Sequence, residues 1–104
     1  MPKFIFAYHG GKAPESPEEG EKVMAEWNAW YGSMGDAVVD GGGPCGQSNT
    51  VSSSGVADDG GANPLSGLTQ VEAADLQSAV EMAKGCPMVQ DGSGSVEVCE
   101  VLAM

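Results

Sequence analysis

The sequence predicts a ferredoxin-like α+β fold, βαββαβ, in which an antiparallel four-stranded sheet carries two helices on one face. Two segments with helical spacing of apolar residues stand among four short segments of strand composition, in the order strand, helix, strand, strand, helix, strand. A glycine- and serine-rich loop separates the two middle strands. The 104 residues have the size of one domain, so residues 1–104 are expected to form a single folded unit.

The first strand is expected at residues 3–9, which read KFIFAYH. Successive side chains of a strand point to opposite faces of the sheet. The aromatic residues therefore share one face and the residues between them share the other: Phe4, Phe6 and Tyr8 against Ile5, Ala7 and His9. Both faces of this strand are largely apolar.

The first helix is expected at residues 17–34. Ser16 can cap it, Pro17 suits the first helical position, and Glu19 completes an S-x-x-E capping box. An apolar stripe, interpreted as core, continues at helical spacing through the segment: Val23, Met24, Trp27, Trp30, Tyr31 and Met34. Gly35 is placed to end the helix in a left-handed cap.

A short second strand, AVVD at residues 37–40, leads into a loop expected at 41–63. Within this loop, residues 50–52 have the composition of a short strand. Long loops in compact domains are often functional or mobile. The glycines of the loop do not match a P-loop and no lysine lies near them, which argues against nucleotide binding.

The third strand is expected at residues 65–73, LSGLTQVEA. Asp75 then caps a second helix that ends at Gly85, and Pro87 is interpreted as preventing its continuation. The last strand is expected at residues 95–102, with Val96 and Val98 on one face and Cys99 and Val101 on the other.

Apolar residues on both faces of the first and last strands predict a homodimer. Two helices cover only one face of a four-stranded sheet, so the second face needs another cover. In a chain this short, the economical cover is a second copy of the same chain, with the two sheets facing each other across a partly enclosed cavity.

Charge and cysteine content narrow the function classes. The formal net charge is −11, with 15 acidic residues against 4 lysines and no arginine, which argues against nucleic-acid and membrane partners. No apolar run is long enough to span a bilayer, and the amino terminus does not have the form of a secretory signal. Three widely spaced cysteines fit neither a zinc site nor a disulfide framework, so reduced thiols in the cytoplasm, no metal and no cofactor are expected.

The candidate catalytic residues are His9 and Asp40, which end the first and second expected strands. These strands run parallel in the predicted fold, so their carboxyl ends lie on one edge of the sheet. A histidine oriented by a carboxylate is a common general base. The alternative is structural: His9 hydrogen-bonds a loop backbone, and Asp40 caps the GGGP turn.

The candidate ligand-binding residues are Gly10, Gly11, Gly42 and Ser66. The glycines follow the two strands at the same edge, where positive φ angles would let backbone amides approach a small anion. The alternative is that they only turn the chain. Ser66 begins the third strand and could reach the same cavity. The three cysteines lack the positively charged surroundings that activate a thiol, apart from Lys84 near Cys86, and are interpreted as unreactive.

The order of several short motifs resembles the YCII-related (DGPF-type) proteins. These motifs are YHGG at the end of the first strand, SPEE at the helix start, Trp-x-x-Trp followed by a glycine, VVDGGGP, NPLSG, AVEMAKGCP and SVEV. The resemblance spans nearly the whole chain. It implies a ferredoxin-like fold, a dimeric α+β barrel, and a small-molecule pocket between the sheet and the partner subunit.

The sequence also departs from the family pattern. Family members with a proposed active site pair a histidine in the first helix with an aspartate before a proline after the second helix. Here the first helix has no histidine, and Cys86 precedes Pro87. The DGPF tetrapeptide is absent, and the nearest stretch is DDGGANPLSG. The resemblance therefore does not transfer catalytic residues to this chain.

Three functions follow as hypotheses. The first is a dimer that binds a small molecule, and the second is a cofactor-free acid–base enzyme, such as a lactone isomerase or hydrolase, that uses His9 and Asp40. The third is an accessory protein that binds another polypeptide through its acidic surface.

Overall fold

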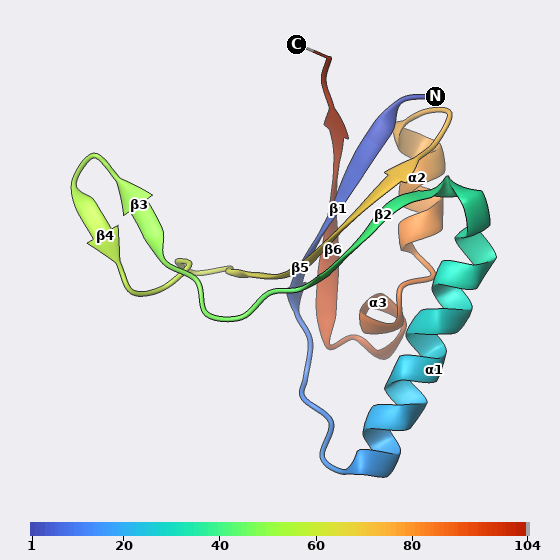
Figure 1. Cartoon of the computed structure of the whole chain (residues 1–104), viewed down its shortest axis with the longest axis horizontal. Coiled ribbons are helices and arrows are strands. Elements are labelled where there is room, and N and C mark those ends of the chain that lie inside the picture. Colours follow the sequence, from blue (N-terminus) through green and yellow to red (C-terminus); the bar gives the residue numbers. More distant parts are fainter. Residues whose placement is uncertain (104) are drawn as a thin grey trace.

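The computed structural model describes residues 1–103 and places a four-stranded sheet between two helices and a projecting hairpin (Figure 1). The elements in chain order are β1 (Lys3–Gly10), α1 (Pro17–Met34), the 3-10 turn η1 (Gly35–Ala37), β2 (Val38–Pro44), β3 (Thr50–Ser52), β4 (Gly55–Ala57), β5 (Leu65–Glu72), α2 (Leu76–Ala83), α3 (Pro87–Asp91) and β6 (Gly94–Val101).

The main sheet confirms the predicted ferredoxin-like topology. Its strand order is β2-β5-β1-β6, and β1 pairs antiparallel with both β5 and β6. β2 pairs antiparallel with β5 at one edge. The first and third strands of the predicted βαββαβ order thus occupy the centre of the sheet, as that fold requires.

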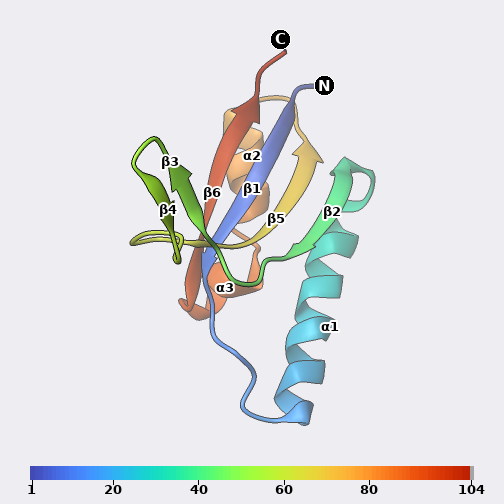
Figure 2. The same ribbon diagram turned by 60° about the vertical axis from the view of Figure 1, so that its left-hand side comes forward.

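Both long helices cover the same face of the sheet (Figure 2). The aromatic residues of β1 are buried beneath them, together with Trp30 of α1 and small residues of α2. The Phe6 and Trp30 rings stack with centroids 6.0 Å apart. We call the opposite face, which α1 and α2 leave uncovered, the open face.

A hydroxyl network ties this core to the edge strand β2. The Tyr8 hydroxyl donates to Thr69 Oγ1 at 2.8 Å, and Thr69 Oγ1 donates to the Gly41 carbonyl at 3.2 Å. The Tyr31 hydroxyl lies 3.1 Å from the same Thr69 oxygen. Burial raises the pKa of Tyr8 far above its usual value, so its phenol stays protonated and remains a donor.

The predicted caps of both helices form, although Glu19 reaches back to the amide of Glu15, one residue before the cap, instead of to that of Ser16. Ser16 Oγ accepts from the Glu19 amide at 3.1 Å, and the Glu19 carboxylate accepts from the Glu15 amide at 3.2 Å. Asp75 Oδ1 accepts from the Ser78 amide at 2.8 Å.

Three segments differ from the sequence-based expectation. The second helix ends before Pro87, as expected, but Pro87 also begins the short helix α3, which the sequence did not predict and at whose first position its missing N–H costs nothing. β2 does not end at residue 40; it continues through the glycines to Pro44 with two irregularities of register. The loop at 41–63 contains a hairpin, since β3 at the expected residues 50–52 pairs with β4.

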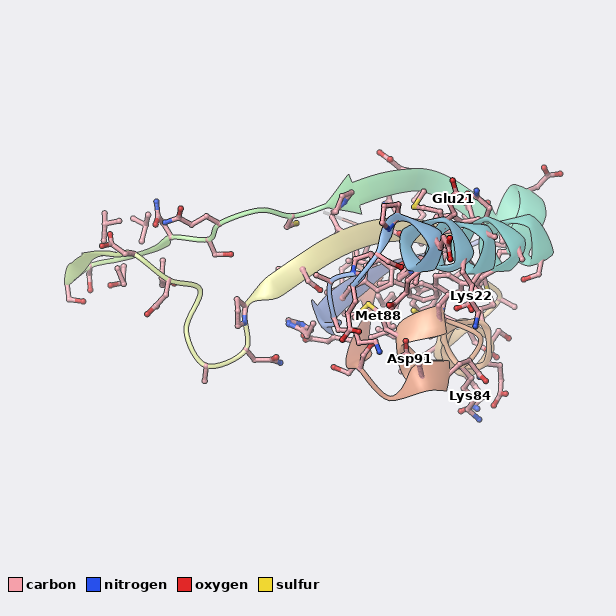
Figure 3. All side chains as sticks on the ribbon, turned by 90° about the horizontal axis from the view of Figure 1, so that it is seen from below. Glu21, Lys22, Lys84, Met88 and Asp91 are labelled. Atoms are coloured by element: carbon pink, nitrogen blue, oxygen red, sulfur yellow. The ribbon has the colours of Figure 1, made fainter. Side chains whose placement is uncertain are left out.

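Residues 45–64, which contain this hairpin, form a projection that we call the arm. It extends away from the body of the protein, on the side of the sheet opposite α1 and α2 (Figures 1 and 3). The radius of gyration is 14.8 Å, against about 13 Å for a compact chain of this length by the usual size scaling. The arm accounts for this extended shape.

Candidate functional site

His9 lies near the end of β1 on the open face. Its neighbours in register are Leu65 on β5 and Ser95 on β6. Although no helix covers this face, the side chain of His9 is only 10 % exposed. Buried histidines need hydrogen-bond partners, and the loop before β5 and a side chain of β6 provide them.

Both ring nitrogens of His9 contact oxygen atoms. Nδ1 lies 3.1 Å from the carbonyl oxygen of Asn63 and 3.2 Å from that of Pro64. A carbonyl oxygen only accepts, so Nδ1 carries a hydrogen. Nε2 lies 3.1 Å from Oε1 of Glu97. With Nδ1 already a donor, this second contact is a hydrogen bond only when a proton lies between Nε2 and the carboxylate. His9 and Glu97 therefore form a histidine–carboxylate pair on the open face.

Glu97 is the solvent-accessible member of the pair. Its side chain is 66 % exposed, and in register it stands opposite Ala7, on the face that also carries His9. Sequence reasoning did not select Glu97. The signal was present in the alternation of the last strand, because a carboxylate at position 97 shares its face with Cys99 and Val101 rather than with the core valines.

The structure does not bring His9 and Asp40 together. Along β5, His9 stands opposite Leu65 and Asp40 opposite Gln70, a separation of roughly 16 Å at about 3.3 Å per residue. The physical reason is the extension of β2 to Pro44, which places Asp40 within the strand instead of at its end. The second reading of Asp40, as a turn cap, fits the geometry: its Oδ1 accepts from the amide of Gly42 at 2.8 Å.

The glycine amides expected to bind an anion are partly used within the chain. The Gly11 amide donates to the Ser93 carbonyl at 2.8 Å, and the Gly42 amide is taken by Asp40. Gly42 has φ +60°, and a Cβ there would run into the carbonyl group of Leu68. This glycine is required by the close approach of β2 to β5, which is a structural role.

A cleft of about 440 Å³ opens at the base of the arm, next to the end of β1. It brings together three of the predicted ligand-binding residues, Gly10, Gly11 and Ser66. Among the described residues, Ser66 Oγ is a buried side-chain oxygen without a hydrogen-bond partner. The polar and acidic residues of its lining include Gln47, Ser48, Asp58 and Asp59. Pro64 and Leu65 connect the cleft to the loop that holds His9.

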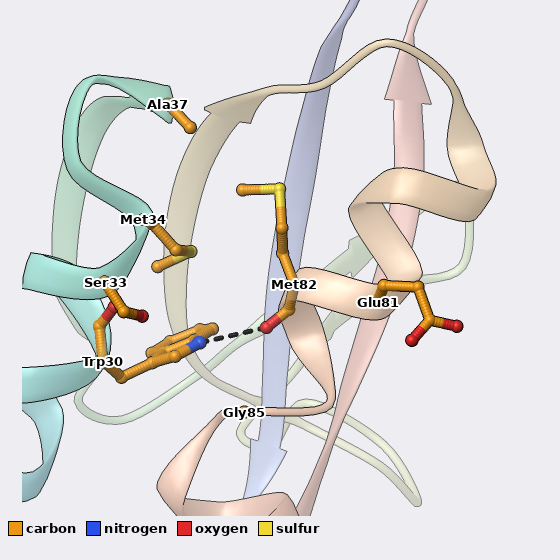
Figure 4. Close-up of a pocket in the computed structure, with 7 residues that line it drawn as sticks. All are labelled: Trp30, Ser33, Met34, Ala37, Glu81, Met82 and Gly85. Carbon is orange, nitrogen blue, oxygen red and sulfur yellow. Dashed lines mark hydrogen bonds between the residues drawn. The ribbon is translucent and has the colours of Figure 1, made fainter.

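A second cleft, of about 330 Å³, lies between α1 and α2 on the other side of the sheet (Figure 4). Met34, Met82 and Ala37 form much of its lining, and the Trp30 indole N–H donates to the carbonyl of Met82 at 3.0 Å. Glu81 is its only titratable lining residue within the described chain. With no pair of proton-transferring groups, this cleft is a less suitable place for chemistry than the open face.

Residues 1–103 contain no cluster of three or more histidine, cysteine or acidic side chains arranged to hold a metal ion. None of the described helices is both long and apolar enough to cross a membrane.

No protein-family model matches this chain, and no curated protein matches it in sequence. A solved structure does match the fold: 5-chloro-2-hydroxyhydroquinone dehydrochlorinase (TftG) from Burkholderia phenoliruptrix AC1100, in complex with 2,5-dihydroxybenzoquinone. The TM-score is 0.60 at 14% sequence identity, and the match covers 100% of this chain and 96% of that chain. This likeness establishes the shared fold.

Proposed function

We propose that this protein is a homodimer of the YCII-related type that binds a small organic molecule on the open face, beside His9 and Glu97. The observation that carries the proposal is the contact between His9 Nε2 and Glu97 Oε1. A largely buried imidazole is held by two backbone carbonyls on one side and by an exposed carboxylate on the other. The fixed imidazole of His9 and the accessible carboxylate of Glu97 together form a preorganised polar site for a ligand.

The structural neighbour supports a ligand of modest size. TftG shares the fold over nearly its whole length, and its structure contains 2,5-dihydroxybenzoquinone, a small hydroxylated ring. The net charge of −11 disfavours a polyanionic ligand. We therefore propose a neutral or weakly acidic hydroxylated ring or lactone.

The pair also supports acid–base chemistry without a cofactor. The exposed carboxylate of Glu97 is the group that touches the ligand, and it takes a proton from a hydroxyl or an activated carbon of the ligand. His9 is a positioning residue in this scheme. Its Nδ1–H is fixed by the carbonyls of Asn63 and Pro64, so the lone pair of Nε2 stays directed at Glu97. Nε2 accepts the proton that Glu97 has taken from the ligand, which leaves an imidazolium beside a carboxylate.

The test measures binding and turnover of a panel of small hydroquinones and lactones, with 2,5-dihydroxybenzoquinone, which is ionised at neutral pH, as the anionic comparison. Binding is measured by thermal shift and calorimetry, and turnover by product analysis. Glu97→Gln keeps the shape and the exposed position, so folding stays intact while turnover falls at least 100-fold, within the usual contribution of a general base. Glu100→Gln is the matched control, because it makes the same charge change on the same strand but opposite Phe4 on the helix-covered face.

Two results separate the binding function from the enzymatic one. Ligand-induced stabilisation without product, lost in His9→Asn, supports a binding protein. Product formation that depends on Glu97 supports the enzyme. Equal ligand binding by wild type, Glu97→Gln and His9→Asn would place the ligand elsewhere and overturn the proposed site.

A further inference from the structure

The arm carries a short hairpin that the rest of residues 1–103 supports little. Val51 stands opposite Val56 in the β3–β4 pair, and the Thr50 hydroxyl donates to the carbonyl of Asp59 at 2.6 Å. Yet neither strand of the hairpin makes extensive contact with another helix or strand among residues 1–103. An isolated two-stranded hairpin is at best marginally stable in water. The arm therefore needs a surface to pack against.

The apolar side chains of the hairpin indicate which part of the arm meets another surface. Val51 and Val56 form a direct cross-strand pair, yet they are 76 % and 66 % exposed. Residues 45–57 of the arm contain no charged side chain, in a chain whose net charge is −11, and its two aspartates, Asp58 and Asp59, lie at its base beside the cleft. The uncharged hairpin with its two exposed valines can therefore contact a second, equally acidic protein surface without charge repulsion.

The exposed area matches the size of a protein interface. The chain exposes 6764 Å², whereas the size scaling of compact monomers gives about 5,400 Å² for a protein of this mass. The excess is roughly 1,300 Å², more than the ~800 Å² that each partner buries in a standard interface. This excess is large enough for the arm and the open face to be covered together.

The open face offers the complementary apolar surface. Leu68 is 39 % exposed, and Cys99 is exposed next to the partly buried Ile5, which it faces in register. The arm projects from this side of the sheet (Figures 1 and 3). Two copies related by a two-fold axis would each supply an arm and an open face. The two equivalent contacts would cover the arm and the open face of both chains, and the assembly would be closed as a dimer.

We infer that the arm of one chain lies across the open face of a second copy, with Val51 and Val56 packed over Ile5, Leu68 and Cys99. Leu68 and Glu97 flank Ala7 from opposite sides in the sheet. The arm of the second copy thus forms an apolar wall beside the carboxylate, and each site is completed by the other chain. The contact deepens the homodimer of the proposed function, and only this last step rests on the proposed ligand site.

The experiment is a cross-link between two different variants, made without ligand in a Cys45→Ser background. One protein carries Val56→Cys and Cys99→Ser together with a size tag, and the other keeps its native Cys99. A mixed disulfide of the two then arises only between chains. Bringing the thiols together requires Cα atoms about 4.4–6.8 Å apart. Val51→Cys replaces Val56→Cys in a parallel series, and Met24→Cys on α1, 60 % exposed, is the matched control.

We expect a mixed disulfide at least 10-fold more abundant from an arm cysteine than from Met24→Cys. We also expect the Val51→Ser/Val56→Ser variant to weaken the dimer at least 10-fold by light scattering, with an unchanged secondary structure. A monomeric wild type, a dimer insensitive to these valines, or a cross-link no stronger than the control would each overturn the inference. Ligand binding is measured separately, so loss of the ligand site with intact cross-links overturns only the proposed function.

Discussion

The hydroxyl of Thr69 joins three parts of the fold, and replacing it tests how the core holds the edge strand. Thr69→Val keeps the shape of the side chain and removes all three hydrogen bonds at Oγ1. The Tyr8 hydroxyl, in a residue only 4 % exposed, is left without a partner, which costs about 1–3 kcal/mol. The lost bond to the carbonyl of Gly41 adds about 1 kcal/mol, while the half-buried Tyr31 hydroxyl turns to water. The expected loss in the free energy of unfolding is about 2–4 kcal/mol.

Urea unfolding followed by tryptophan fluorescence measures this loss, because Trp27 and Trp30 contact the Tyr8 ring. Tyr8→Phe alone removes one hydrogen bond and costs about 1 kcal/mol. The double variant Tyr8→Phe/Thr69→Val leaves no unsatisfied phenol, so it should be less destabilised than the two single variants added together, by about 1–2 kcal/mol. Additivity within about 0.5 kcal/mol would refute the reasoning, since it would mean that the two groups do not interact.

Three further outcomes follow from single positions. Gly42→Ala should destabilise the protein by more than about 1 kcal/mol in urea unfolding, because its φ is positive and the carbonyl of Leu68 occupies the place of a Cβ. Gly41→Ala, with open space around the Cβ position, is the control. The hydrogen bond from the Ser78 amide lowers the pKa of the Asp75 carboxyl. The stabilisation by this cap is therefore complete above the unfolded pKa of Asp75, about 4, and is lost as the pH falls through the lower folded value. Asp75→Asn should reduce this acid sensitivity in urea titrations at pH 7 and pH 3. Burial raises the pKa of the Cys86 thiol, so a thiol reagent should modify two cysteines in the folded protein and the third only after unfolding.

Each of these outcomes has a result that contradicts it. Equal stability of the Gly42→Ala and Gly41→Ala variants would mean that β2 and β5 separate without cost. An unchanged pH dependence in Asp75→Asn would show that this cap does not contribute to acid sensitivity. Reaction of three thiols in the native protein would show that Cys86 becomes exposed through local opening of the fold.

The fold could be predicted because its signals are local and agree with one another. The caps at Ser16 and Asp75 specify where two helices start, and both are seen in the hydrogen bonds. Alternation in β1 separates the core aromatics from the open face. The arm was predicted only in part, since residues 50–52 have strand composition while residues 55–57 follow a serine-rich turn with little strand propensity.

The sequence identified only one of the two residues that form the candidate pair. His9 was selected correctly as a residue at the end of a strand, and its hydrogen bonds to the carbonyls of Asn63 and Pro64 match the structural alternative. Its carboxylate neighbour was assigned to Asp40, on the assumption that β2 stops there. β2 instead continues through three glycines, because pairing with β5 satisfies their backbone and tolerates their irregular register.

The sequence alone determined the order of the elements, the helix starts and the division of β1 into a core face and an open face, since each depends on residues within one turn or one strand. Only the tertiary structure decided that Glu97 meets His9, because 88 positions separate the two residues and the contact depends on the register between β1 and β6. The same holds for the arm. Its exposed valines become noticeable only once the rest of the chain is seen to leave them uncovered.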